Sequence, residues 1–167
     1  MRILIGNGIS LVSALFLFLG GVAKTKRGKY FFQFLDCVFL IISQMVFLQV
    51  AGAVSMVFSA TRNYLASKEK YNLTALVTVF TANAVLGLLL NTGGTVGLIP
   101  VLATLFLTVT AYFLHEPHVV RVAVMINIGM WVVYGFLISD YVTAVTNSVA
   151  FLINAVTLTV SLLGKSK

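Results

Sequence analysis

Two neighbouring apolar segments of this chain carry polar side chains at helical spacing, a pattern that can bind a small solute. One helical face of the first segment has Asn127, Trp131 and Tyr134, and one face of the second has Thr143, Asn147, Asn154 and Ser161. If the segments cross a membrane in opposite directions, helical rise puts Asn127 and Asn154 at similar depth, with Trp131 and Asn147 within about one or two turns of each other. An indole can stack on a solute and an amide can hydrogen-bond it. We therefore expect a substrate-binding site at Trp131, Asn147, Asn127, Asn154 and Tyr134; the alternative is that the amides only join helices, at about 0.6 to 2 kcal/mol each.

A second candidate site involves two charged groups. Asp36 is the one carboxylate well inside an apolar segment, where it shares a helical face with Gln33. Arg62 shares a face with Ser55 and Ser59 and is the basic residue nearest to Asp36 in depth. Charged groups within hydrocarbon pair with one another or mark a transport path. We expect an ion pair between Asp36 and Arg62; the alternative left open is that Asp36 titrates in proton-coupled transport.

Other chemistry finds little support in the sequence. His115 and His118 flank Glu116 in a short connection that offers no fourth metal ligand, so they are expected to be loop residues. The lone Cys37 lies within an apolar segment, where packing is its expected role. Phosphate-binding loops, nucleophile elbows and clustered thiols are absent from the sequence. We expect no metal, no cofactor and no enzymatic activity.

Composition places all of these residues in a membrane protein. Hydrophobic residues make up 60% of the 167 and charged residues 9%, against about 25% charged in a soluble domain. Apolar runs of about 20 residues form membrane-spanning helices, because a helix satisfies its own backbone hydrogen bonds in lipid. We predict one all-α transmembrane domain over residues 1–167. The expected spans are 5–23, 30–48, 50–66, 73–90, 95–113, 119–138 and 141–163, with a tight hairpin between the second and third.

The basic residues predict how this domain is oriented. They collect in alternate connections between the runs, and such residues favour the cytoplasmic side of a membrane. One side has Lys24, Lys26, Arg27, Lys29, Arg62, Lys68, Lys70, Arg121, Lys165 and Lys167, and the other has Arg2 alone. We therefore expect the amino terminus outside and the carboxyl terminus in the cytoplasm. The net charge of +7 is spread over short clusters, so nucleic acid is not an expected partner.

The chain also shows signs of an internal repeat. A shift of 90 residues places Leu15-Phe16-Leu17 on Leu105-Phe106-Leu107, and a shift of 91 places Asn63 on Asn154. Span order, loop length and charged side correspond as well. We predict two three-helix repeats, residues 1–70 and 93–167, joined by an inverting linker helix at 71–92. Parallel repeats of this kind are known from transporters, whose sites lie near the midplane between the halves.

Two resemblances add to this interpretation. The stretch from Trp131 to Gly135, followed by Asp140 and Asn147, resembles the second and third helices of a SWEET or SemiSWEET repeat of the MtN3 and PQ-loop superfamily. Along the whole chain the closer resemblance is to the YgjV family of bacterial inner-membrane proteins. The stretches that carry it are Gly52-Ala53 with Arg62, Ile99-Pro100-Val101, and Arg121 before Trp131.

These resemblances imply a bacterial inner membrane and a SWEET-like bundle of three, one and three helices. They also imply that Trp131 and Asn147 face the substrate, as their counterparts do in SWEET proteins. The chain departs from that pattern, since it lacks a Pro-Gln pair and has Leu40 and Met56 at the positions 91 residues before Trp131 and Asn147. A symmetric sugar site is therefore not expected, and an asymmetric pocket remains open.

The expected function is a facilitator or secondary transporter of a small polar solute, working by rocking of the two repeats around a midplane cavity. The alternative is a non-transporting membrane receptor, sensor or partner subunit with the same fold, for which a sealed interior would be evidence. The expected partners are membrane lipid and a solute whose identity the sequence does not give. A homo-oligomer remains open.

Overall fold

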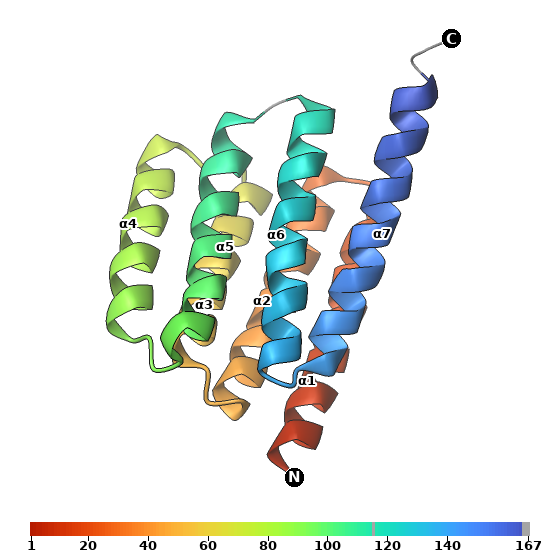
Figure 1. Cartoon of the computed structure of the whole chain (residues 1–167). Helices are drawn as coiled ribbons and strands as arrows, with labels where there is room; N and C mark the ends of the chain where they lie inside the picture. Colours follow the sequence, from red (N-terminus) through yellow and green to blue (C-terminus); the bar gives the residue numbers. More distant parts are fainter. Residues whose placement is uncertain (115, 165–167) are drawn as a thin grey trace.

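A computed structural model of the chain consists of helices joined by short connections (Figure 1). It describes residues 1–114 and 116–164, so His115, Lys165 and Lys167 lie outside the described residues. The helices are α1 (Arg2–Val22), α2 (Lys26–Val46), α3 (Val50–Ser67), α4 (Leu73–Leu89), α5 (Gly94–Phe113), α6 (Pro117–Leu137) and α7 (Tyr141–Gly164). Their bounds differ from the predicted spans by at most four residues. The tight hairpin between α2 and α3 is confirmed.

Five of these helices are long and apolar enough to cross a membrane, namely α1, α2, α5, α6 and α7. The apolar helix α4 has 17 residues and is shorter than the others. Helix α3 has 18 residues but carries the polar residues Ser55, Ser59, Arg62 and Asn63, which lower its hydropathy. All four of these side chains are buried. The polar face of α3 is thus turned toward the protein interior.

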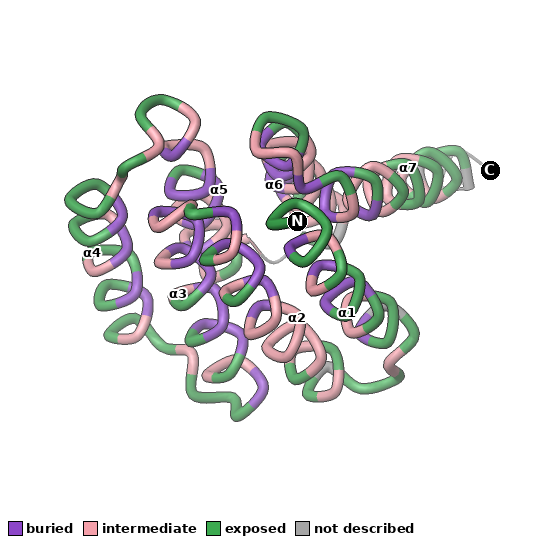
Figure 2. Tube along the Cα trace, turned by 90° about the horizontal axis from the view of Figure 1, so that it is seen from below, coloured by how far each residue is buried: buried purple, intermediate pink, exposed green. Residues whose placement is uncertain are grey.

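Six of the helices form a closed ring, and α4 lies outside it. Following the ring, α1 packs on α2, α2 on α3, α3 on α5, α5 on α6, α6 on α7, and α7 on α1. Helix α4 packs against α3 and α5 (Figure 2). It is held there by Gly87, against which Val101 of α5 packs, and by Asn83, whose amide donates to the Val101 carbonyl over 3.3 Å.

The helices alternate in direction, so the start of α1 and the end of α7 lie at opposite ends of the bundle (Figure 1). The carboxyl-terminal end also has the α1–α2, α3–α4 and α5–α6 connections. Basic residues concentrate there, and we call it the basic end: Lys24, Arg27, Lys29, Lys68, Lys70 and Arg121. The opposite end, with the α2–α3, α4–α5 and α6–α7 connections, is the amino-terminal end.

The α2–α3 and α6–α7 hairpins have the same backbone structure at positions 91 residues apart. Leu48 (φ 61°) and Ser139 (φ 64°) both adopt a left-handed conformation two residues after a helix ends, which lets the chain reverse direction. The next amide in each hairpin closes the turn, Gln49 N–H donating to Gln44 C=O and Asp140 N–H to Gly135 C=O, at 2.9 Å each. The donor and the acceptor of the first bond each lie 91 positions before those of the second.

Close contact at Gly52 of α3 gives a test of the packing. A Cβ atom at this position would collide with the Tyr134 hydroxyl and the Gln44 side chain, which lie on α6 and α2. We predict that Gly52→Ala lowers the free energy of unfolding by about 1–3 kcal/mol, as overpacking does. The measurement is thermal unfolding in detergent. The matched control is Gly8→Ala, where no atom lies within 4 Å; equal stability of both variants would contradict the packing.

Candidate functional site

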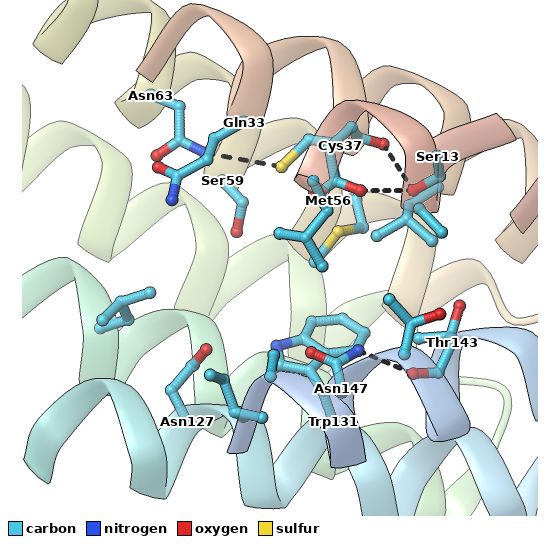
Figure 3. Close-up of a pocket in the computed structure, with 18 of the residues that line it drawn as sticks. Ser13, Gln33, Cys37, Met56, Ser59, Asn63, Asn127, Trp131, Thr143 and Asn147 are labelled. Atoms are coloured by element: carbon cyan, nitrogen blue, oxygen red, sulfur yellow. Dashed lines mark hydrogen bonds between the residues drawn. The ribbon is translucent and has the colours of Figure 1, made fainter. Parts of the chain in front are cut away.

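A cavity of about 180 Å³ lies at the centre of the helix ring (Figure 3). Side chains from all six ring helices line it, and α4 contributes none. An apolar cavity of about 150 Å³ holds a benzene molecule. The volume therefore suits a small solute of about six to eight non-hydrogen atoms.

Helices α6 and α7 supply an aromatic ring and two amides to the cavity. Trp131 is buried and packs edge-on against Tyr134, with ring centroids 5.5 Å apart. Asn127 donates one N–H to the Ala103 carbonyl over 2.7 Å, and Asn147 donates one to the Thr143 carbonyl over 2.9 Å. Figure 3 shows Asn127, Trp131 and Asn147 directed into the cavity. Each amide can still offer a solute its oxygen and its second N–H.

Helices α2 and α3 supply charge. Asp36 of α2 accepts a hydrogen bond from the Ser13 hydroxyl of α1. Arg62 of α3 donates to the Asn63 side-chain oxygen over 3.3 and 3.4 Å and to the Thr108 hydroxyl over 3.5 Å. Both Asp36 and Arg62 line the cavity. Helices α2 and α3 therefore bring a carboxylate and a guanidinium to the same cavity within the membrane.

The predicted ion pair between Asp36 and Arg62 is not formed. Among the residues that the structure describes, each group is bonded to neutral side chains and not to the other. Spacing along the sequence placed both groups on faces that line the interior, but it does not fix how α2 and α3 pack against each other. The two charges face a shared cavity instead of closing on each other.

Two of the predicted site residues lie outside the cavity lining. Tyr134 is fully buried behind Trp131, and its hydroxyl donates to the Gln44 side-chain oxygen over 2.7 Å. Asn154 is only partly buried and donates to the Ala150 carbonyl of its own helix over 2.8 Å. Its place near Asn127 was expected for a straight antiparallel pair, but α7 leans away from the bundle toward its carboxyl-terminal end (Figures 1 and 2).

The cavity is lined by residues at matching positions of the two halves. Seven pairs of lining residues are separated by 91 positions. They are Ser13 and Thr104, Gln33 and Val124, Asp36 and Asn127, Cys37 and Ile128, Leu40 and Trp131, Met56 and Asn147, and Ser59 and Ala150. Only the two hydroxyls of the first pair have similar chemistry. At matching positions the two halves carry different groups. Where the first half has the carboxylate of Asp36, the second has the amide of Asn127.

A hydrogen-bonded network closes the ring below the cavity, at the amino-terminal end. The Ser10 hydroxyl of α1 donates to the Asp140 carboxylate over 3.0 Å, and the Asn7 amide of α1 donates to the Ser139 carbonyl over 3.0 Å. The Asn7 oxygen in turn accepts from the Val142 N–H over 2.9 Å. Burial raises the pKa of Asp140 above its usual value, and the bonds from Thr143 and Ser10 oppose that shift. First and last helices are thus joined at this end.

The basic end is packed less tightly between α1 and α7. Among the residues of α7 whose burial is described, Thr146 is the last that is buried, and Leu152, Val156 and Val160 are all more than half exposed. The cavity is therefore closed at the amino-terminal end by polar bonds, while α7 leaves the ring toward the basic end (Figures 1 and 2).

Comparison with known proteins agrees with this membrane architecture. A family model described as bacterial inner membrane protein, Imp-YgjV, matches residues 4–161. The chain belongs to the Imp-YgjV family. No curated protein and no solved structure matches it. This Imp-YgjV protein is accordingly a multi-pass protein of the bacterial inner membrane.

Several polar groups of this family member were missed as site residues. Cys37, assigned to packing, is buried but also lines the cavity, where its sulfur accepts a long hydrogen bond of 3.6 Å from the Asn63 amide. Asn63 is the repeat counterpart of Asn154, and only Asn63 lines the cavity. The 91-residue offset, applied to the predicted Asn127 and Asn154, leads to Asp36 and Asn63, which both line the cavity, whereas no predicted residue leads to Cys37.

The buried Tyr134 hydroxyl gives a test that separates packing from binding. We predict that Tyr134→Phe lowers the free energy of unfolding by about 1–3 kcal/mol, because the buried oxygen of Gln44 loses its donor. Any solute bound in the cavity should keep its affinity, since Tyr134 lies outside the lining. Thermal unfolding with and without solute measures both effects. The control is Tyr141→Phe, at a tyrosine that is 53% exposed. If Tyr134→Phe kept its stability but no longer bound solute, the assignment of Tyr134 to packing would be contradicted.

Proposed function

We propose that this inner-membrane protein is a facilitator or secondary transporter that carries a small polar solute, and is not an enzyme. The solute binds in the central cavity and crosses the membrane as one three-helix unit rocks against the other. The observation that carries the proposal is the cavity itself. It lies at the centre of a ring of membrane-embedded helices, and both halves line it with residues at positions 91 apart.

The proposed units are the repeats 1–70 and 93–167, with α4 as the inverting linker, in a SWEET-like arrangement of three, one and three helices. The packing supports this division. When α1, α2 and α3 are exchanged with α5, α6 and α7, each packed pair of ring helices becomes another packed pair. One chain supplies all six ring helices, so the proposed transport unit is a single chain.

The proposed orientation puts the basic end in the cytoplasm and the amino terminus outside. The basic residues support this, since Lys and Arg are retained on the cytoplasmic side of spans. The network at Ser10, Asn7 and Asp140 would then be the outer closure of the cavity. Opening outward would break these bonds between α1 and the α6–α7 connection, each worth about 0.5–1.5 kcal/mol. That cost is small enough for bound solute to shift the balance between the two states.

A receptor, sensor or partner subunit is the second candidate. It would be favoured by a sealed, apolar interior, whereas the cavity here is bordered by amides, hydroxyls and two charged groups. Such a lining costs stability in a protein that only needs to pack. We therefore favour the carrier.

The amide at Asn147 provides the most direct test. We predict that Asn147→Ala weakens binding of the transported solute about tenfold or more, because it removes hydrogen-bonding groups from the cavity, whereas its one side-chain bond among the described residues is to its own helix. Trp131→Phe should also weaken binding, while keeping an aromatic ring in the core.

Solute-dependent thermal stabilisation and uptake into proteoliposomes are the measurements, and unfolding without solute reports whether the variants still fold. Val145→Ala and Val133→Ala, at exposed positions of α7 and α6, are matched controls. Loss of folding equal to the loss of binding would indicate that Asn147 serves packing alone.

Cys37 is the single cysteine of the chain and lines the cavity, so it reports which side has access. We predict that a small membrane-impermeant methanethiosulfonate modifies it faster from the cytoplasmic side than from the outside, because the outer closure is formed. Rates in inside-out and right-side-out vesicles, followed by mass spectrometry, measure this, and Cys37→Ser is the unlabelled control. Faster modification from outside would contradict the proposed orientation or the closure.

A further inference from the structure

The cavity contains two opposite charges that are not paired with each other. Asp36 and Arg62 are the two charged groups among its described lining residues. The other carboxylate near the ring, Asp140, is occupied by Ser10 and Thr143 at the amino-terminal end and does not line the cavity. The cavity is therefore neutral overall, but its positive and negative charges are separated.

Neither charge is fully satisfied by the protein. The Ser13 hydroxyl donates to Oδ1 of Asp36, and among the described residues none donates to Oδ2. The guanidinium of Arg62 has five N–H donors, and the bonds it makes are to neutral oxygens at 3.3–3.5 Å, longer than the 2.7–2.9 Å usual for a charge-assisted bond. Charged groups within a membrane are retained when they pair or serve a pathway. Here the counter-charge has to come from the cavity.

From these charges we infer that the solute is a small zwitterion, an inference that rests on the proposed carrier function. Its ammonium group binds the Asp36 carboxylate, and its carboxylate binds the Arg62 guanidinium. A solute with a single charge would leave Asp36 or Arg62 without a counter-charge, and a sugar or polyol would leave both. A zwitterion of six to eight non-hydrogen atoms also suits the cavity of about 180 Å³.

The second half of the cavity fits this solute without adding charge. Asn127 holds the repeat position of Asp36, and the position that corresponds to Arg62 is Ile153. Trp131 offers a ring face to an ammonium group or an apolar side chain, and Asn147 offers an amide. Charge recognition thus belongs to the first repeat, and contact with the remainder of the solute belongs to the second.

The test compares solutes of one shape and different charge on the purified full-length protein. Alanine is matched by isobutyrate, which lacks the ammonium, by 3-methylbutan-2-amine, which has two methyl groups in place of the carboxylate oxygens, and by lactamide, which is neutral. Because the separation of charges in the solute is not fixed by the structure, β-alanine and γ-aminobutyrate are included. Thermal stabilisation measures binding. We expect at least one of the three zwitterions to bind, and alanine, where it binds, to do so at least tenfold more tightly than its three analogues.

Two variants assign each charge to its partner. In Asp36→Asn the bound zwitterion should lose its advantage over a carboxylate-only analogue, and in Arg62→Gln it should lose its advantage over an amine-only analogue. Glu69→Gln and Lys70→Gln make the same charge changes at exposed residues and should alter neither preference. A merely structural role would lower stability without changing which analogue binds better. If a variant does not fold, the relative affinities of the solutes for the unaltered protein still decide whether the solute is a zwitterion.

The outcomes separate this inference from the proposed function. Binding of a singly charged or neutral analogue as tight as that of its zwitterion would overturn the zwitterion and leave the carrier standing. The zwitterion would also be overturned, and the carrier left standing, if none of the three zwitterions bound while a sugar, a polyol or a dicarboxylate bound and was taken up. Failure of all these solutes to bind or to enter proteoliposomes would count against both.

Discussion

The structure depends on the exclusion of polar side chains from lipid. Within a bilayer an unpartnered hydroxyl, amide or charge has no water to bond with, so it must turn inward. Helix α3 illustrates the result, because its polar residues Ser55, Ser59, Arg62 and Asn63 are all buried, although they leave it outside the set of helices that are long and apolar enough to cross a membrane by themselves. A ring of six helices gives such residues a shared interior. The cavity is the space that remains when the polar groups of several helices meet but do not fill the centre.

The two halves of the ring resemble each other in backbone more than in chemistry. Their hairpins reverse at Leu48 and Ser139 with the same conformation, and their cavity residues fall at a constant offset. At those shared positions the residue types differ, as with Asp36 and Asn127 or Leu40 and Trp131. The matching backbone places side chains in the cavity at corresponding positions, and the residue type at each position sets which groups the cavity presents. This division explains how a nearly symmetric ring can hold an asymmetric site.

Much of the fold was predictable from hydropathy, because runs of apolar residues mark helices in a membrane regardless of their packing. The inward direction of Trp131, Asn127 and Asn147 also followed from helical spacing. What spacing does not contain is the rotation and tilt of one helix against another. Asn154 lies on the part of α7 that leaves the ring and is outside the cavity lining, and Asp36 and Arg62 bond to neutral side chains instead of to each other. These are properties of the assembled ring, which no single segment encodes.

The bonds between α1 and the α6–α7 connection have a consequence for biogenesis. Asn7 and Ser10 are made before their partners Ser139 and Asp140, which follow them by 132 and 130 positions, after α2 to α6. Until the α6–α7 connection is made, α1 can bond only to earlier parts of the chain, as Asn7 does to the Ile3 carbonyl and Ser10 to the Ser43 hydroxyl. The ring therefore closes only after α7 has been made and packs on α1. A nascent chain stalled before α7 would hold an open arc of helices, with its polar interior accessible to lipid or to an insertase.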